Sequence, residues 1–338
     1  MADITVSSDI DTFLQSADNA AARASIGADV RTDANGAFSA GDLGGNARGA
    51  NAINIQAARS AVTQVASGTN AVAIGTNAIA SGGGATASGY AATASAAGAI
   101  ALGYFATASG ENATALGNGA TASGNASTAL STFSNASGNY ATASGNYTTA
   151  TGYGATASGI YASASGSGAI ASGFGTNASG NSATALGYAS TASGNYATAT
   201  GNYANASNSY ATALGSNATA SGYGATASGF LVTASQTKSG AFGYRAKSAT
   251  ANVQELGYWS NSTTRAGAVR VHGTGYVAIS TPQTDTAFTD GGATAGSEAD
   301  GTIFRKGLAF RVSVAGNLIA TYCKADGTII TKDLGAMA

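Results

Sequence analysis

Side chains that could carry out chemistry are few in this 338-residue chain, and they gather in its last third. The single histidine, His272, could bind an ion only if copies of it met on a symmetry axis. One predicted loop contains four carboxylates, Asp285, Asp290, Glu298 and Asp300. They lack the Asp-x-Asp-x-Asp-Gly spacing of a calcium site. The sequence also gives no distance between two of them that would identify the carboxylate pair of a glycosidase. No nucleophile stands in a motif with a base. We therefore expect a solvated loop, and a chain that is not an enzyme and carries neither cofactor nor metal.

Aromatic residues of the same region offer a different chemistry. Tyr258, Trp259 and Tyr276 could stack on the faces of sugar rings, so they are candidates for a glycan contact. The alternative is that they form the core of a small β-domain. Segments such as TIFRKGLAFRVSV (302–314) alternate apolar and polar residues as strands do, and we predict a compact β-domain over residues 245–338.

The charge distribution divides the chain into three parts. Residues 60–237 contain one charged side chain, Glu111, whereas residues 1–59 carry a net charge of −3 and residues 238–338 a net charge of +3. The whole chain has a net charge of −1, which offers no bulk attraction to nucleic acid or to an anionic membrane. No run approaches 18 consecutive apolar residues, so we expect no membrane insertion. The one cysteine, Cys323, excludes an intrachain disulfide framework.

Residues 68–243 follow a strict period of seven. Counting from Gly68 in steps of seven gives 26 registers; glycine fills 22 of them, and the residue two positions before each register is always alanine. The exceptions to glycine are Ala96, Ser131, Asn208 and Gln236. The pattern Ala-x-Ala has a period of two, which indicates short strands with alanine on one side, and glycine supplies the freedom to bend. Each heptad is therefore predicted to be a strand and a turn rather than part of a coiled coil.

A period of 14 underlies the heptad. The residue before the register position is apolar only in alternate heptads, and it is serine or threonine in all thirteen of the others. In seven heptads of the same set the residue after the register position is aromatic or apolar, as at Tyr90 and Tyr104, so we expect these residues to share the outer side of the apolar strand. The strand residues of this kind form the predicted stripe: Ile74, Leu102, Leu116, Leu130, Leu186, Leu214 and Phe242.

The stripe predicts an oligomer. A solenoid coil with an alanine interior buries about four methyl groups, each contributing ~0.8 kcal/mol. Ordering the backbone costs on the order of 1–2 kcal/mol per residue. A single roll is therefore marginal, and three rolls that share the stripe along an axis would remove the deficit. We predict a homotrimer in which the Thr/Ser strands face water.

Three segments of this repeat resemble a known family. TNAVAIGTNAIASG (69–82), NATALGNGATASG (112–124) and NSATALGYASTASG (181–194) are similar to the head repeats of the YadA-like trimeric adhesins. The resemblance covers residues 65–244 and implies a trimeric left-handed parallel β-roll with about 14 residues per coil. Secreted members of that family carry a signal peptide and end in a membrane β-barrel segment. MADITVSSDI lacks a basic, apolar leader and DLGAMA lacks a terminal aromatic residue, so we expect neither here.

A second resemblance concerns the N-terminus. FLQSADNAAARASIGA (13–28) resembles a segment of phage tail-fibre and other virion-fibre proteins, and its Ala-rich run before Gly27 predicts a short helix. The expected fold is therefore all-β apart from this helix. We divide the chain into an N-terminal attachment segment (1–60), a β-roll (61–244) and a C-terminal tip (245–338).

Three functions are compatible with these observations. The first is a structural fibre or decoration protein of a phage virion, in which residues 1–59 dock onto other virion proteins and residues 245–338 contact a glycan or protein of the host surface. The second is a bacterial trimeric autotransporter-type adhesin or a fragment of one. The third is an ice-binding solenoid, because the Thr/Ser rows resemble Thr-x-Thr arrays, although Asn135, Asn177 and Asn205 interrupt them.

Overall fold

The structure is a computed structural model. It describes residues 31–32, 38–40, 49–56, 65–259, 264–273, 277–280, 283–284, 307–312, 317–323 and 329–336. The chain forms two compact units, Met1–Tyr147 (unit 1) and Thr148–Ala338 (unit 2). The described residues contain strands and turns but no helix, and the helix expected at 13–28 lies outside them. The division into an attachment segment, a roll and a tip stays a prediction.

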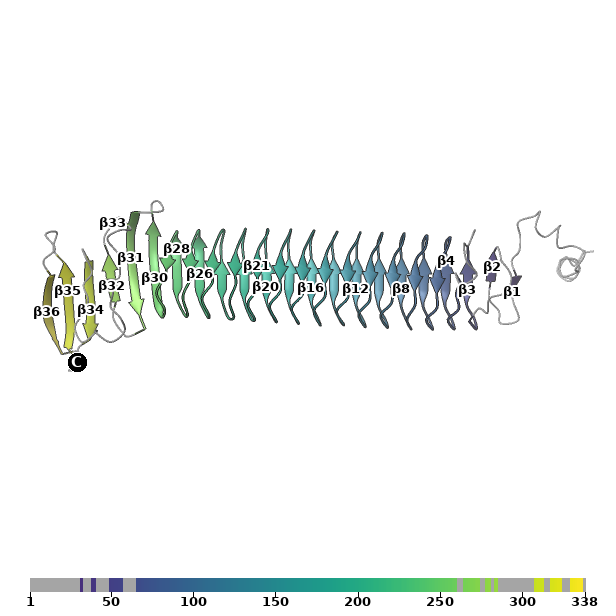
Figure 1. Cartoon of the computed structure of the whole chain (residues 1–338), viewed down its shortest axis with the longest axis horizontal. Coiled ribbons are helices and arrows are strands. Elements are labelled where there is room, and N and C mark those ends of the chain that lie inside the picture. The colour runs from purple at the N-terminus through teal and green to yellow at the C-terminus, as the bar shows by residue number, and fades with distance from the viewer. Residues whose placement is uncertain are drawn as a thin grey trace, which may run out of the picture. The chain divides into compact units, whose positions relative to one another are not determined.

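Unit 1 is a parallel β-solenoid, in which each coil contributes one strand to each of two sheets (Figure 1). After the first pair, β1 (Arg31–Thr32) and β2 (Phe38–Ala40), sheet A contains β3 (Ile53–Ile55), β4 (Val72–Ile74), β6 (Thr86–Ser88), β8 (Ile100–Leu102), β10 (Thr114–Leu116), β12 (Thr128–Leu130) and β14 (Thr142–Ser144). Sheet B contains β5 (Ile79–Ala80), β7 (Thr93–Ala94), β9 (Thr107–Ala108), β11 (Thr121–Ala122) and β13 (Asn135–Ala136). From β4 onward neighbouring strands pair in register at 14 residues, as at Thr114 and Thr128, whereas β3 and β4 pair at an interval of 19 residues.

Unit 2 repeats this architecture. Sheet A contains β16 (Thr156–Ser158), β18 (Ile170–Ser172), β20 (Thr184–Leu186), β22 (Thr198–Thr200), β24 (Thr212–Leu214), β26 (Thr226–Phe230), β28 (Gly240–Tyr244) and β30 (Val253–Trp259). Sheet B contains β15 (Thr149–Ala150), β17 (Ser163–Ala164), β19 (Asn177–Ala178), β21 (Thr191–Ala192), β23 (Asn205–Ala206), β25 (Thr219–Ala220), β27 (Thr233–Ala234) and β29 (Lys247–Ser248). The prediction of an all-β parallel roll with 14-residue coils is confirmed.

The interior of the coils is built mostly from alanine, with a few other small residues such as Ser127, Thr148 and Val232. In the coil that contains β10 and β11, Ala113, Ala115, Ala120 and Ala122 all have no exposed surface. Ala115 lies in the sheet A strand and Ala113 directly before it, while Ala122 lies in the sheet B strand and Ala120 directly before it. The two sheets therefore face each other across a layer of methyl groups. A larger side chain would have to push the two sheets apart, which explains why alanine recurs at these positions.

Two turns close each coil, and they lie on opposite edges of the roll. The first edge consists of the triplets that follow sheet A strands, from 75–77 to 243–245 at intervals of 14 residues. The second edge consists of the triplets that follow sheet B strands, from 68–70 to 236–238 at the same interval. The third residue of every triplet has a φ between 49° and 67°, in the left-handed region. Asparagine and glycine are common there because they adopt this conformation at the lowest cost.

The register glycines have different roles on the two edges. On the first edge the register residue has a φ between 110° and 140°, which favours glycine, and Ser131 is the only other residue type there. On the second edge the register residue does not have a positive φ, and glycine instead allows the backbone of the next coil to approach closely. Three of the four exceptions to glycine, Ala96, Asn208 and Gln236, lie on this more permissive second edge.

One turn of unit 2 allows a direct test of this requirement. At Gly173 φ is 127° and an added Cβ would overlap the carbonyl oxygen of Gly187, whereas at Gly175 φ is 62° and an added Cβ would meet nothing within 4 Å. We expect Gly173→Ala to lower the free energy of unfolding by at least about 1–3 kcal/mol. Gly175→Asn should change it little, because Asn77 and Asn217 occupy the equivalent position. Urea denaturation followed by circular dichroism at one protein concentration measures both, and equal losses would contradict this account of the turn.

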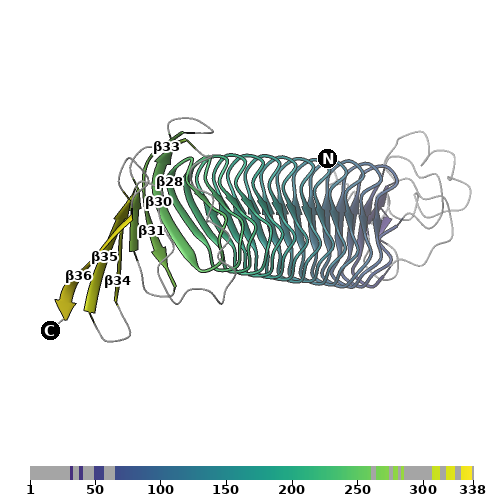
Figure 2. The ribbon, with the colours of Figure 1, turned by 60° about the vertical axis from the view of Figure 1, so that its left-hand side comes forward.

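Sheet A of unit 2 continues beyond the roll into antiparallel strands (Figure 2). Strand β30 pairs in parallel with β28 and antiparallel with β31. The following strands are β31 (Thr264–His272), β32 (Val277–Ser280), β33 (Gln283–Thr284), β34 (Gly307–Val312), β35 (Asn317–Cys323) and β36 (Ile329–Ala336). The parallel register thus extends past residue 244 to Tyr258, where the next strand reverses direction.

Candidate interaction surfaces

The seven predicted stripe residues lie in one column on the outer face of sheet A in each unit. In unit 1 the register aligns Leu102, Leu116 and Leu130 on successive strands. Leu116 is 45% exposed. Before it in the column come Leu102 and then the polar residue Ser88. The full column members are Ile74, Leu102, Leu116 and Leu130 in unit 1, and Leu186, Leu214 and Phe242 in unit 2. Nothing in a single chain covers these half-buried or exposed side chains within the described residues.

The aromatic residues that follow the register position are not on the face of sheet A, and this part of the prediction is wrong for most of them. Tyr90 and Tyr104, for example, lie in the first-edge turns, because the left-handed φ of Gly89 and Gly103 ends the strand before them. Only at the C-terminal end of the roll, in the longer strands β26 and β28, do Phe230 and Tyr244 extend sheet A. The first-edge aromatics therefore border the stripe and do not belong to it.

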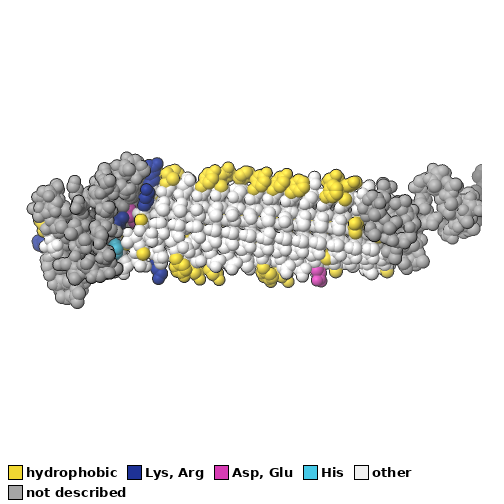
Figure 3. Space-filling view, in the orientation of Figure 1, with side chains coloured by type: hydrophobic (Ala, Val, Ile, Leu, Met, Phe, Trp, Pro, Cys, Tyr) yellow, Lys and Arg dark blue, Asp and Glu magenta, His cyan; other side chains and the backbone are white. Residues whose placement is uncertain are grey.

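The two edges differ in chemistry. Among the turn triplets of the described roll, Phe, Ile and Leu occur on the first edge and not on the second. They are Phe105, Phe133, Ile160, Phe174, Phe230 and Leu231. The large apolar residues of the second edge are all tyrosines: Tyr140, Tyr153, Tyr196, Tyr210 and Tyr223. Of the charged residues in the triplets, Glu111 and Lys238 lie on the second edge, and Arg245 lies in the last triplet of the first edge. Figure 3 shows hydrophobic side chains along the edges of the units and a mostly polar sheet face between them.

Neighbouring rings on each edge are stacked across coils. On the first edge, the ring centroids of Phe174 and Tyr188 are 5.2 Å apart with an angle of 6° between the planes, and Tyr188 meets Tyr203 at 5.4 Å. A hydrogen bond with Tyr188, with repulsion from its phenolate as a second cause, raises the pKa of the Tyr203 phenol above its ordinary value. On the second edge, Tyr196 stacks on Tyr210 at 5.2 Å and Tyr210 meets Tyr223 edge-on at 5.5 Å. Each such contact contributes about 0.5–1.5 kcal/mol.

The outer face of sheet B carries rows of hydroxyl groups. Thr107 and Thr121 pair in register on successive strands and are half-buried, while Ser109 and Ser123 beside them are exposed. Asparagine replaces threonine in this column at Asn135, Asn177 and Asn205, as the sequence analysis noted. From Thr93 to Thr233 this column is polar and uncharged, whereas Ile79 precedes it, and this separates the face chemically from the stripe on sheet A.

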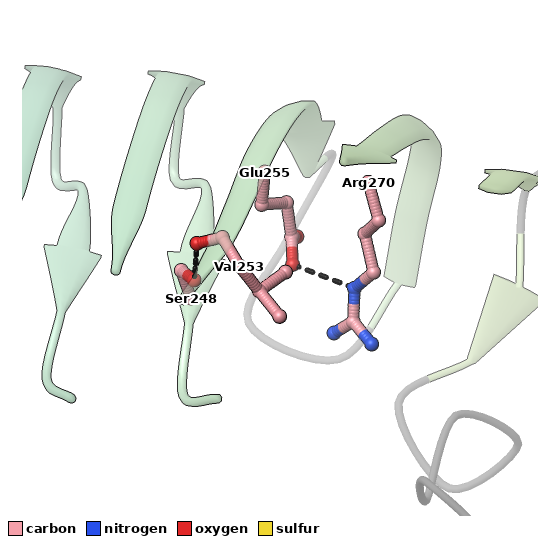
Figure 4. A network of polar contacts seen from close by, with 4 residues as sticks. All are labelled: Ser248, Val253, Glu255 and Arg270. Atoms are coloured by element: carbon pink, nitrogen blue, oxygen red, sulfur yellow. Dashed lines mark hydrogen bonds and ion pairs between the residues drawn. The ribbon is translucent and has the colours of Figure 1, made fainter. Parts of the chain in front are cut away.

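Larger buried polar side chains border the alanine interior near the start of the described coils in unit 1 and after the last parallel coil in unit 2. In unit 2, Glu255 occupies the column of interior alanines directly after Ala241 and has no exposed surface. Arg270 on the antiparallel strand β31 donates to it from Nε to Oε2 at 3.0 Å (Figure 4). In unit 1, Gln56 Nε2 donates to Asn54 Oδ1 at 2.6 Å and to the carbonyl oxygen of Ala78 at 2.8 Å. The residue pattern did not lead us to predict these groups, although Glu255 stands in the alanine register and could have been recognised there.

The C-terminal candidates for chemistry remain predictions. Tyr258 and Trp259 belong to β30, but their side chains lie outside the described part, as do Tyr276 and the carboxylate loop at 285–300. His272 ends β31 and is half-buried. Among the side chains that the structure describes, no group of three or more His, Cys, Asp or Glu residues could hold a metal ion. In the same part of the chain, no helix has the length and apolar character needed to cross a membrane.

The comparisons with known proteins concern the roll. None of the curated proteins matches the chain. The model of the YadA head domain repeat, which contains two copies of the repeat, matches residues 66–87, 80–106, 108–130, 150–176, 178–204 and 206–230. These segments contain much of the alanine interior and every stripe residue except Phe242, and they support an adhesin-type roll while giving no support to a virion fibre. Residues 66–230 thus carry repeats similar to the YadA head domain repeat.

Proposed function

We propose that this chain is a non-enzymatic structural adhesin, whose roll assembles as a homotrimer through the stripe and the first edge. The observation that carries the proposal is an apolar band, exposed in the single chain, that runs from sheet A onto one edge only. After Leu102 and the turn glycine Gly103 come the first-edge residues Tyr104 and Phe105, which are 51% and 50% exposed. Exposed apolar surface of this extent is typical of an interaction site.

The edge asymmetry gives each protomer an orientation in the trimer. Because Phe, Ile and Leu lie on the first edge, burial against another copy is favourable there. The second edge carries Glu111 and Lys238 with exposed tyrosines, and the outer face of sheet B carries hydroxyl groups. These two surfaces should therefore face the solvent. Cyclic symmetry allows three identical bands to meet along one axis.

The similarity of the roll to adhesin repeats favours the second function of the sequence analysis over the first. The virion setting depends on residues 13–28, which the structure does not describe. Attachment through residues 1–59 and contact with a host surface through residues 245–338 remain part of the proposal for either setting. Immunogold labelling of intact source cells and of particles purified from them separates the two settings.

The trimer is tested with two matched triple variants in unit 2. Phe174, Tyr188 and Tyr203 on the first edge are 45%, 45% and 53% exposed, and Tyr196, Tyr210 and Tyr223 on the second edge are 56%, 53% and 46% exposed. Light scattering of the full chain should give three times 32.3 kDa. Changing the first-edge triple to asparagine should weaken the trimer at least tenfold, which corresponds to about 1.4 kcal/mol, because it removes buried rings.

The same change in the second-edge triple should leave the trimer intact, because those rings stay in water. Both triples remove three rings of equal exposure, so a general effect of lost ring stacking would appear in both. A wild-type monomer at micromolar concentration, or equal weakening by the two triples, would overturn the proposed contact surface.

A further inference from the structure

The second edge of unit 2 has the composition of a recognition surface. Its six triplets from 152–154 to 222–224 consist entirely of Gly, Asn, Ser and Tyr. Tyrosine offers a large, rigid and amphipathic contact area at a low entropy cost, and Ser, Gly and Asn offer adaptable hydrogen bonds, which is why binding loops are rich in these four residues. Tyr196, Tyr210 and Tyr223 form a continuous ladder on this edge, which we call the tyrosine ladder.

The fold itself does not need tyrosine at two of these positions. Tyr196 and Tyr210 are held at φ values of 58° and 59°, which are costly for a bulky residue. Glycine occupies the equivalent third position at Gly154, Gly168 and Gly224 with a φ between 60° and 63°. Placing rings at these two positions therefore costs backbone strain, which points to a role for the rings outside the packing of the coil.

The hydroxyl groups of the ladder distinguish it from the first edge. The first edge, which the proposed trimer would bury, carries phenylalanines such as Phe105 and Phe133 beside its tyrosines. On the second edge every ring carries a hydroxyl group. Within the described residues, no hydrogen bond of the chain engages the phenol oxygens of the three ladder tyrosines. These hydroxyls are therefore available to a ligand.

The backbone beneath the ladder is already ordered. The Tyr210 backbone N–H donates a hydrogen bond to the carbonyl oxygen of Asn195 at 2.9 Å, and the Gly224 backbone N–H donates one to the carbonyl oxygen of Ser209 at 3.0 Å. These bonds tie successive second-edge triplets together along the roll. A ligand would thus meet a rigid row of rings, and little conformational entropy would be lost on binding.

The spacing and the charge of the ladder indicate the class of ligand. Its ring centroids are 5.2 and 5.5 Å apart, which is comparable with the length of one sugar residue in a linear chain. No triplet from 152–154 to 222–224 contains a charged side chain, so the surface suits an uncharged ligand rather than an acidic or basic one. Sugar hydroxyls can bond to phenol and amide groups, and sugar C–H groups can contact ring edges and faces.

We propose that the tyrosine ladder binds a neutral linear polysaccharide that lies along the second edge with about one sugar residue per coil. The proposal rests on the trimer proposed above, because that arrangement leaves the second edge facing the solvent. It places a glycan contact on the roll, separate from the C-terminal candidates Tyr258, Trp259 and Tyr276. The roll would then be an adhesive surface in its own right and more than a spacer.

The test uses the full chain and five hexasaccharides in isothermal titration calorimetry. Four are neutral, the hexamers of cellulose, amylose, xylan and mannan, and the fifth is the acidic hexamer of polygalacturonate. We expect at least one neutral hexamer to bind and the acidic hexamer to bind at least tenfold more weakly. The triple variant Tyr196→Phe, Tyr210→Phe and Tyr223→Phe keeps the rings but removes the hydroxyls, and it should weaken binding at least tenfold.

The control variant removes hydroxyls from the neighbouring face instead. Thr191→Val with Thr219→Val alters the outer face of sheet B, and glycan binding should stay unchanged. Light scattering of the same samples separates the two proposals. A trimer that binds no neutral hexamer, that binds the acidic hexamer as well, or that binds equally after the tyrosine changes overturns the ladder proposal alone. A monomer that still binds through the ladder overturns the trimer alone.

Discussion

Replacing Leu116 and Leu186 with aspartate should convert the assembled protein into monomers or aggregates. In the single chain Leu116 is 45% exposed and Leu186 is half-buried, so aspartate at either position costs an isolated coil little. In a trimer closed over the stripe, each aspartate would be a buried, unpaired charge, which costs several kcal/mol. Two changes in each of three chains add up to more than a marginal assembly can tolerate. Light scattering measures the resulting mass.

The matched control carries the same charges on the opposite sheet. Ser123 and Ser193 are exposed beside sheet B, and Ser123→Asp with Ser193→Asp should leave both the mass and the circular dichroism spectrum unchanged. This pair separates the effect of a buried charge from that of added negative charge as such. If the leucine variant stays a trimer of unchanged stability, the stripe is not the contact between copies.

Removing Arg270 should be the most damaging single change at the end of the roll. Glu255 has no exposed surface and its Oε2 accepts a hydrogen bond from Arg270 Nε at 3.0 Å. Arg270→Met would leave the carboxylate buried without this cation, which typically costs about 3–5 kcal/mol. Urea denaturation should show this loss as a lower midpoint.

The double variant Glu255→Ala with Arg270→Met should recover most of that stability. Alanine at 255 continues the interior column that contains Ala227 and Ala241, so the alanine register predicts a well-packed end coil without the ion pair. A double variant as unstable as Arg270→Met alone would show that the carboxylate is not the cause of the loss. A stable Arg270→Met variant would show that water or another group satisfies Glu255.

The regular part of the fold could be predicted because every coil repeats the same local preferences. Alanine at most interior positions, glycine at most registers and the 14-residue recurrence of Leu102, Leu116 and Leu130 define two sheets and one apolar column without any long-range information. In a parallel solenoid the contacts of each coil are with its neighbours, so the period of the sequence is also the period of the structure. The stripe could be identified for the same reason.

The positions of the edge residues could not be predicted as well. Tyr90 and Tyr104 shared the 14-residue phase of the stripe, but phase alone does not show whether a residue extends a strand or begins a turn. The φ of Gly89 and Gly103 decides that it begins a turn. The restriction of phenylalanine to one edge is visible in the sequence only after alternate turns have been assigned to opposite edges.

By itself, the sequence determined the period, the alanine interior, the two unequal sheets and the apolar column, because these depend on residue type and on spacing within one coil. Tertiary structure alone decided how the repeat ends. Glu255 and Arg270 meet because strand β31 runs antiparallel to β30, a reversal that breaks the period and brings together side chains 15 residues apart. The repeated pattern specifies the structure of each successive coil, whereas the end of the roll depends on a contact that the pattern does not contain.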